Sequence, residues 1–419
     1  MNNAEKWQLL SDKIGGSEGD EVVSALQDLY TLQDDNLIKW YANLYDPKIG
    51  GYYYSNSARD NESVIFGGKE YKLLPDAEAT FHCVGWWSGS GIHGGITEWG
   101  MWLPEWMQKD VLSFIYNLQD EDGFFYHPQW GKDVGISRRA RDLMWSLHMV
   151  NAFGMTPKYK TVHEAKKDDE SSKTLIPEHL RSEEAFAKYL EGLNIGERSY
   201  HSGNELAAQS SQIVSCGRID QCIEFLNRTQ HPETGHWHSK SNYYAVNGLF
   251  KLFFAYNAAN IPFPNAMAAA RSAIDAITSD EPMSAVTDLY NTWYTVANLL
   301  DNLRNHAGEE GNRLADGVVA ELRELAPAAI RKSKEKILPF KKADGAFSYG
   351  PKSSSATSQG APTAIPNSPE GDENATTIAT NGLIGNIYRA LELSDYRVPP
   401  FGDAERKRYI TILEQNKFG

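Results

Sequence analysis

Polar side chains gather at the start of each apolar helical segment that this sequence predicts. They comprise acids, amides, arginines and a tyrosine, as follows: Asp76 and Glu78, Arg138 and Arg139, Asn204 and Glu205, Asn242 and Tyr243, Asp288 and Asn291, Glu373 and Asn374. Capping explains an Asp or Asn at such a position, because its side chain accepts a hydrogen bond from a free backbone N–H. Capping does not explain Arg138 and Arg139, since cations oppose the dipole at a helix start. These two arginines predict an anionic partner.

Two reactions on a carbohydrate fit these residue types. Hydrolysis of a glycosidic bond needs one carboxyl group as acid and a second as base or nucleophile. Glu205 and Asp288, expected on different helices, are the candidates, with Asp76 as a third. Elimination at a uronic acid instead needs Arg or Asn on the carboxylate and a Tyr or His base, for which Tyr243 and His201 are candidates. The sequence leaves both reactions open.

The other candidate residues would bind the substrate. Sugars are held by aromatic rings together with amide, guanidinium and carboxyl groups. The candidates are Tyr53, Glu78, Arg138, Arg139, Trp237, His238, Asn242, Asn291, Glu373 and Asn374. Three histidines surround Trp237, at 231, 236 and 238, but no Cys or carboxylate at a recognised spacing completes a four-ligand site. We therefore expect no metal and no cofactor.

The elements that would position these side chains are helices in two interleaved sets. Helix-period apolar runs of amphipathic, charged composition occur at about 20–45, 100–118, 178–193, 216–228, 263–278 and 312–338. Runs poor in charge, typical of buried helices, occur at about 76–88, 137–153, 203–215, 242–257, 285–302 and 373–391. Six outer and six inner helices predict an all-α (α/α)6 toroid in which every inner helix begins at the same end.

A repeated turn supports this prediction. A Gly precedes an aromatic residue by one or two positions at Gly50, Gly123, Gly235 and Gly345, each time after a helical run. Such repetition is typical of a supersecondary unit that stacks on its own copies. We expect one domain over residues 1–419, with an N-terminal extension (1–19) and a C-terminal helix (403–416). Residues 155–177 are expected to be a solvated linker, and the Ser/Pro/Gly-rich segment 350–372 a lid or a disordered loop.

Composition limits the partners. The chain of 419 residues has a net charge of −14, which disfavours nucleic acid and anionic membrane surfaces. Three cysteines, an N-terminus without an apolar run, and no apolar stretch of membrane-spanning length predict a cytoplasmic protein. The expected partner is a small-molecule or oligosaccharide substrate, and a homo-oligomer stays open.

The pattern resembles the α/α-toroid superfamily, which includes terpenoid cyclases, prenyltransferase β subunits, glycoside hydrolases, polysaccharide lyases and sugar 2-epimerases. The segments 119–125 and 230–237 resemble the Gln-Trp motif of the cyclases, and 373–378 resembles the last repeat of prenyltransferase-like toroids. The resemblance implies the fold but not the reaction. No DxDD or DDxxD cluster of the cyclases occurs here.

A glycoside hydrolase acting on an acidic oligosaccharide is therefore the first expectation. The alternatives are a uronate-specific lyase, a sugar epimerase, a terpenoid cyclase-like enzyme and a non-catalytic sugar-binding protein.

Overall fold

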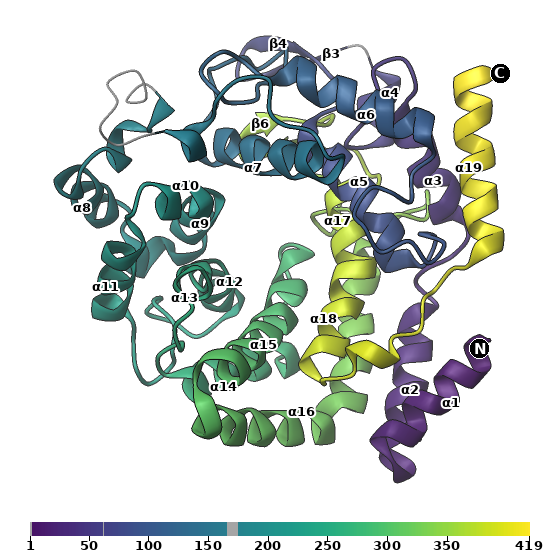
Figure 1. The fold of residues 1–419 in the computed structure, drawn as a ribbon. Coiled ribbons are helices and arrows are strands. Elements are labelled where there is room, and N and C mark those ends of the chain that lie inside the picture. The colour runs from purple at the N-terminus through teal and green to yellow at the C-terminus, as the bar shows by residue number, and fades with distance from the viewer. Residues whose placement is uncertain (1, 62, 166–174) are drawn as a thin grey trace.

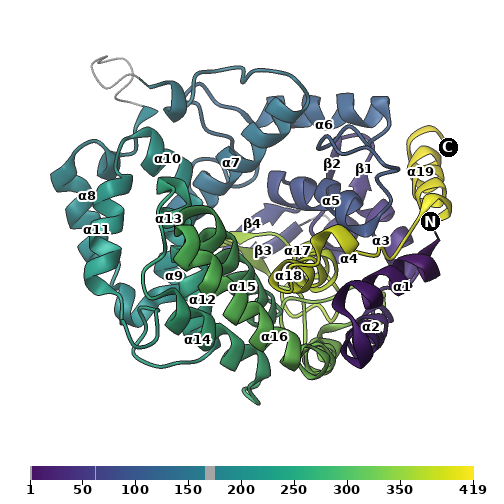
Figure 2. The same ribbon diagram turned by 60° about the horizontal axis from the view of Figure 1, so that its bottom comes forward.

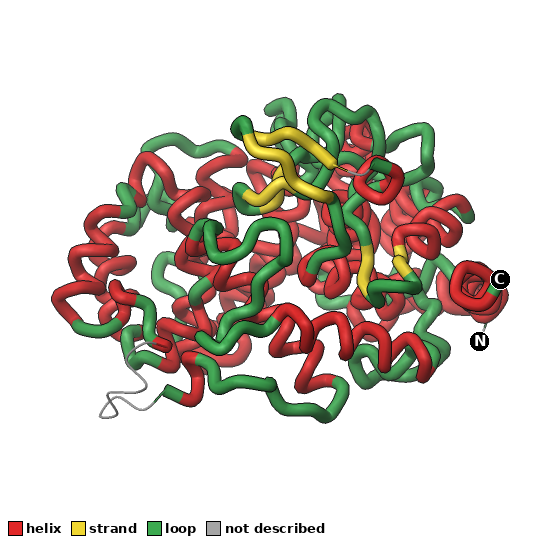
Figure 3. Tube along the Cα trace, turned by 90° about the horizontal axis from the view of Figure 1, so that it is seen from above, coloured by secondary structure: helices red, strands yellow, loops and turns green. Residues whose placement is uncertain are grey.

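Helices make up most of the chain in a computed structural model that describes residues 2–61, 63–165 and 175–419 (Figure 1). Within these ranges the strands form three two-stranded hairpins: β1 (Tyr45–Asp46) with β2 (Gly51–Tyr52), β3 (Ser63–Phe66) with β4 (Lys69–Lys72), and β5 (Thr357–Ser358) with β6 (Ala361–Pro362). Figure 3 shows how little of the trace they occupy. The expected all-α class is confirmed. Residues 166–174 of the expected linker lie outside the described residues.

Six helical segments contact one another in sequence, and we call them the inner helices. They are α5 (Ala77–Ser90), α7 (Ile136–Ala152), α9 (Ile195–Ala208), α12 (Tyr243–Leu252), α15 (Thr287–His306) and the continuous stretch of α17 (Glu373–Thr377), η5 (Ile378–Gly382) and α18 (Leu383–Ala390). Each contacts the next, and α17 contacts α5, so the contacts form a closed circuit. The segment η5 is a single π-helical turn.

Other helices pack outside this circuit. They are α2 (Gly16–Tyr30), α3 (Asn36–Leu44), α6 (Glu105–Leu118), α8 (Glu183–Gly192), α11 (Ile219–Thr229), α14 (Ala266–Thr278) and α16 (Gly308–Ile337). Figure 1 shows α8, α11, α14 and α16 on the outside of α9, α12 and α15, and Figure 2 shows α16 next to α15 from another side. Their apolar residues are largely buried and their charged residues largely exposed, as their composition predicts.

The remaining elements lie at the chain ends and in the connections. They are α1 (Asn3–Ile14), α4 (Asn56–Asp60), η1 (Val162–Glu164), η3 (Glu178–Leu180), α10 (Ser210–Ser215), α13 (Phe254–Ala259), η4 (Leu338–Phe340), η6 (Ser394–Tyr396) and α19 (Asp403–Phe418). The predicted C-terminal helix corresponds to α19, which packs on α3. The N-terminal extension is itself helical, since it contains α1, and α1 packs on α2.

The four Gly–aromatic turns share one mode of packing. All four glycines have a positive φ, which for Gly123 is 84° and for Gly345 is 88°. A Cβ on Gly123 would lie 2.2 Å from the carbonyl oxygen of Lys160, and one on Gly345 would lie 2.8 Å from Cβ of Asn36. Each turn therefore lies directly against another segment, and only glycine fits there. The repeated turn predicted from the sequence is confirmed.

One inner helix begins earlier than the sequence predicts. The helix expected at about 203–215 is α9, which starts at Ile195 after Asn194 in the left-handed region, with a φ of 50°. Asn204 and Glu205 are residue types typical of a helix start, but they lie in the interior of α9. The expectation that all the polar pairs stand at helix starts is therefore wrong for this pair. The other five inner helices begin within about two residues of the predicted positions.

Candidate functional site

Two adjoining pockets lie among the inner helices, and we call them together the central cavity. Their volumes are about 280 Å³ and about 440 Å³. Arg141, Lys251, Tyr290, Asn374 and Ile378 line both pockets. Every inner helix contributes to the wall of the larger pocket. A cavity of this size, with a few convergent polar groups, is typical of a small-molecule site.

The smaller pocket is mostly polar. Besides the shared residues, its wall consists of Tyr54, Tyr200, Asn204, Thr287, Asn291, Tyr349, Ser355, Thr357, Ser358 and Gln359. The segment 355–359, which contains β5, belongs to the long 350–372 connection that the sequence marked as a lid or a disordered loop. The structure places this segment in the cavity wall.

The larger pocket is mostly aromatic. Its wall includes Phe81 and Trp145, whose rings stack with centroids 5.9 Å apart, and Phe250 and Tyr294, with centroids 4.7 Å apart. Aromatic faces of this kind can stack on the apolar face of a sugar ring. The central cavity thus joins a polar end to an aromatic end.

A buried arginine joins three carboxylates beside the cavity. The guanidinium of Arg138 donates to Glu78 at 2.6 Å, to Asp142 at 2.7 Å and to Asp76 at 3.1 Å. The ring of Trp130 lies 4.4 Å from it. Burial raises the pKa of Asp142 to about 7, although Arg138 opposes this shift. The anionic partner expected for Arg138 is therefore supplied by the protein itself.

Glu78 connects this cluster to the cavity wall. Its Oε1 accepts a hydrogen bond from Arg141 at 3.3 Å, and its Oε2 accepts one from Ser358 Oγ at 2.5 Å. Burial raises the pKa of Glu78, but Arg138 and Arg141 more than offset this effect, and the net pKa is below its usual value. Glu78 is consequently ionised at neutral pH and holds Arg141 in place.

A histidine–carboxyl pair lies one helical turn further along α5, on the same side as Glu78. His82 Nδ1 is 3.1 Å from Oε2 of Glu373, and the Glu373 side chain is fully buried. Burial raises the pKa of Glu373 to about 8, against the opposing effect of His82. Burial lowers the pKa of His82, but Glu373 outweighs it and the net pKa is raised. The pair therefore retains a proton near neutral pH, and His82 lines the larger pocket.

Lys251 is the least compensated cation in the cavity. Within the described part of the chain, its Nζ has neither a carboxylate partner nor a hydrogen bond, and its nearest recorded contact is the Phe250 ring, 4.7 Å from Nζ to the centroid. Burial and the nearby Arg141 guanidinium lower the pKa of Lys251 to about 7, with Glu78 opposing. A substantial fraction of this amine is consequently neutral at pH 7.

Several predicted site residues do belong to the cavity or its supporting cluster. Asn291 and Asn374 line the cavity. Asp76, Glu78, Arg138 and Glu373 lie directly behind its wall, where they bind one another or the lining residues Arg141, Ser358 and His82. Asp76 also caps α5, since Ala79 N–H donates to it at 3.0 Å.

The expected catalytic residues face elsewhere. Glu205 accepts a hydrogen bond from Tyr189 of α8 at 2.6 Å, because its position in α9 points outward. Asp288 accepts hydrogen bonds from the N–H groups of Ser284 and Ala285 and from Asn247, so it secures the start of α15. Neither acid lines the central cavity, and the expected pairing of Glu205 with Asp288 is not found.

The two expected bases also lie away from the cavity. Tyr243 packs against α16, where Lys336 donates to its hydroxyl. His201 is exposed on α9 and lines neither pocket.

The remaining predicted contacts have structural partners. Trp237 is fully buried and donates to the carbonyl of Leu226 at 2.9 Å. His238 is partly exposed, and its Nδ1 accepts from the Lys240 N–H at 3.1 Å. Asn242 caps α12.

Tyr53 and Arg139 likewise lie outside the cavity wall. The Tyr53 hydroxyl donates to Asp46 at 2.9 Å. Arg139 lies 5.0 Å from the ring of Phe124 and has no ion pair within the described ranges. The anionic partner predicted for Arg139 is therefore absent there.

Sequence reasoning missed the residues that dominate the cavity. Arg141 lies one helical turn after Arg138 and lines the central cavity. His82, which also lines it, lies one turn after Glu78. Lys251 was visible as the single charge in the otherwise apolar run 243–254. A charged residue in such a run requires a polar environment, and this signal could have identified it.

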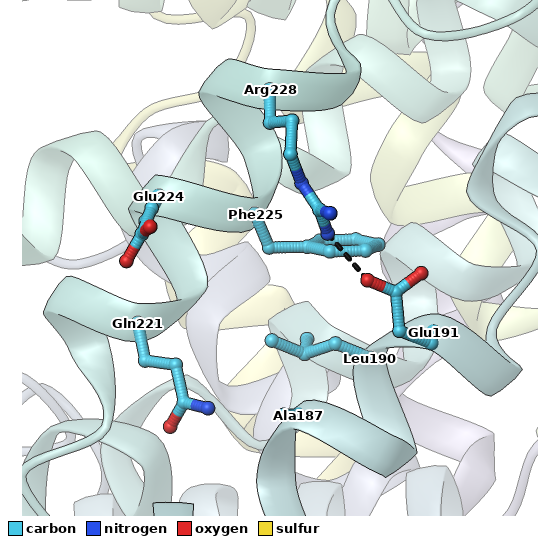
Figure 4. Close-up of a pocket in the computed structure, with 7 residues that line it drawn as sticks. All are labelled: Ala187, Leu190, Glu191, Gln221, Glu224, Phe225 and Arg228. Atoms are coloured by element: carbon cyan, nitrogen blue, oxygen red, sulfur yellow. Dashed lines mark hydrogen bonds and ion pairs between the residues drawn. The ribbon is translucent and has the colours of Figure 1, made fainter.

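A further pocket lies on the surface between α8 and α11 (Figure 4). Three charged residues line it, and two of them, Arg228 and Glu191, pair with each other with both side chains more than half exposed. Figure 4 shows this pair beside Phe225, with no other charged group turned toward it. The only cation in the lining of this pocket, Arg228, is therefore already paired.

Among the described residues there is no group of three or more His, Cys, Asp or Glu side chains that could hold a metal ion, and no helix long and apolar enough to cross a membrane. No family model, no curated protein and no solved structure matches this chain.

Proposed function

We propose that the inner and outer helices form an (α/α)6 toroid. The support is the closed circuit of contacts among the inner helices, with the outer helices packed behind them. The four equivalent turns between outer and inner helices agree with a repeated helical hairpin. In this arrangement the central cavity is the lumen of the ring.

We further propose that the protein is a lyase acting on a saccharide that contains a uronic acid. One observation carries the proposal: the central cavity presents two cationic side chains, Arg141 and Lys251, while no carboxylate lines it within the described ranges. In a chain with a net charge of −14, such a site is selective for an anion. The aromatic wall then suits the sugar ring that bears the carboxylate.

The cavity contains the groups that an elimination requires. Arg141, held by Glu78, would bind the substrate carboxylate and make the neighbouring C–H more acidic. The neutral amine of Lys251 would remove that proton. The C–H electrons would form the new double bond as the C–O bond at the adjacent carbon breaks. Burial raises the pKa of Tyr290 above its usual value, so its hydroxyl stays protonated and could protonate the departing oxygen.

The experiment is incubation with uronate-containing oligosaccharides. Elimination would create a double bond conjugated to the carboxylate, which absorbs in the near ultraviolet, and the rate would rise as the pH increases through about 7 because Lys251 must be neutral. Arg141→Gln should reduce the rate, whereas Arg139→Gln is the matched control and should not. Reducing ends that appear without the absorbance would contradict the lyase.

A glycoside hydrolase is the second candidate. The observation in its favour is that burial raises the pKa of Glu373 to about 8, while neighbouring arginines hold the pKa of Glu78 below its usual value. Two carboxyl groups with such different pKa values are typical of an acid and base pair. Glu78, however, is already bonded to Arg138, Arg141 and Ser358. The release of reducing ends, lost in Glu373→Gln, would favour this candidate.

A further inference from the structure

Lys251 combines three features that a nucleophilic lysine requires. It lies at the junction of the two pockets and lines both of them. It has no carboxylate partner in the described part of the chain, although most buried lysines are paired. It also lies near a second cation, Arg141, which disfavours protonation of the amine.

We propose that Lys251 forms a covalent imine with 2-oxo acids that enter the central cavity, with Arg141 binding their carboxylate. This activity goes beyond elimination and does not depend on it. The central cavity would then support imine formation with a carbonyl compound as well as elimination from a sugar acid. The ligand class follows from the wall: a cation for the carboxylate, and an amine for the adjacent carbonyl carbon.

The chemistry needs no external oxidant or reductant. The lone pair of Lys251 Nζ attacks the carbonyl carbon and gives a carbinolamine. The carbonyl oxygen then leaves as water with the two protons of the amine, and a C=N bond remains. His82, whose pair with Glu373 retains a proton near neutral pH, lines the same cavity and can relay one of these protons: it protonates the departing oxygen and takes a proton back from the amine. The imine withdraws electrons from neighbouring bonds and so activates them for cleavage.

Reductive trapping tests the proposal. The full chain is incubated with pyruvate and sodium borohydride, and the labelled lysine is identified by peptide mass mapping. We expect one reduced adduct, on Lys251, with labelling half-maximal near pH 7 rather than near the pKa of an ordinary lysine, about 10.4. Labelling spread over surface lysines, or absent from Lys251, would overturn the proposal. This result needs no variant, so a folding defect cannot obscure it.

Variants make the test more specific. Lys251→Met should abolish the adduct, whereas Lys332→Met, which removes a lysine paired with Asp280 at 2.6 Å, should leave it unchanged. Arg141→Gln should reduce labelling by pyruvate about tenfold or more, because a charge-assisted bond to the carboxylate is lost. The same variant should change labelling by acetone, which has no carboxylate, much less. Equal losses with the two carbonyl compounds would overturn the role of Arg141.

The two proposals fail separately. An adduct on Lys251 without elimination would leave the imine chemistry and remove the lyase. Elimination with no adduct would overturn the inference and leave the lyase.

Discussion

Arg138 compensates three buried carboxylates, and its removal should be costly. In Arg138→Met, Glu78 would keep Arg141 and Ser358, and Asp76 would keep the Ala79 N–H. Asp142 would lose both hydrogen bonds recorded for it, which come from Arg138 at 2.7 and 3.1 Å. Breaking a buried ion pair typically costs about 3–5 kcal/mol. We expect a loss near the lower limit, about 3 kcal/mol, because Asp142 can take up a proton.

The assay is urea unfolding at pH 7, followed by circular dichroism and tryptophan fluorescence. The free energy of unfolding should fall by this amount with no change in the denaturant slope. Arg139→Met is the matched control. Arg139 contacts the ring of Phe124 and has no ion pair among the described residues, so its loss should be about 1 kcal/mol or less.

The pH dependence tests the mechanism. Without Arg138, the folded-state pKa values of all three carboxyls rise: those of Asp76 and Asp142 move further above their usual values, and that of Glu78 rises from below its usual value. The native variant therefore binds more protons than the native wild type. Lowering the pH from 7 to 5 therefore favours folding of the variant more than folding of the wild type, and the difference between them should shrink. A deficit equal to that of Arg139→Met, or one that is independent of pH, would refute the idea that Arg138 neutralises buried charge.

Two further predictions concern packing and the acid pair. Gly248→Ala should destabilise the protein by about 1–3 kcal/mol, because a Cβ there would lie 2.5 Å from Ser199 Oγ; Gly317→Ala, on an exposed helix face with nothing within 4 Å, should stabilise it by up to about 1 kcal/mol. Unfolding curves that shift in the same direction would contradict the proposed contact. Glu373→Gln should lower the pKa of His82, since the carboxylate is what raises it. An NMR titration of the His82 ring that finds the pKa unchanged would disprove that coupling.

The sequence predicts the helices better than the site, and the reason is physical. Helix period and turn chemistry are local, so the starts of α5, α7, α12 and α15 could be inferred to within about two residues. Cavity lining depends on which face of a helix turns inward, and capping groups lie at the ends rather than on that face. Asp288 and Asn242 therefore serve their own helices.

A difference of a few positions along a helix also changes the surroundings of a side chain. Arg138 and Arg141 are three positions apart in α7, yet Arg138 is fully buried among carboxylates and Arg141 lines the central cavity. Ser358 reaches Glu78 from 280 positions away, and a single sequence contains no signal for that contact. Long-range contacts of this kind decide the electrostatics of the site.

The contact between α5 and α17 has a consequence for biosynthesis. These two segments are about 290 residues apart in the chain, and His82 meets Glu373 across them. During translation, the side of α5 that packs on α17 has no partner until the last inner helix leaves the ribosome, because domains are built from the N-terminus onward. Nascent chains that stop before residue 373 should therefore expose the apolar side of α5 that normally packs on α17. Such chains should depend on chaperones until α17 is made and packs on α5.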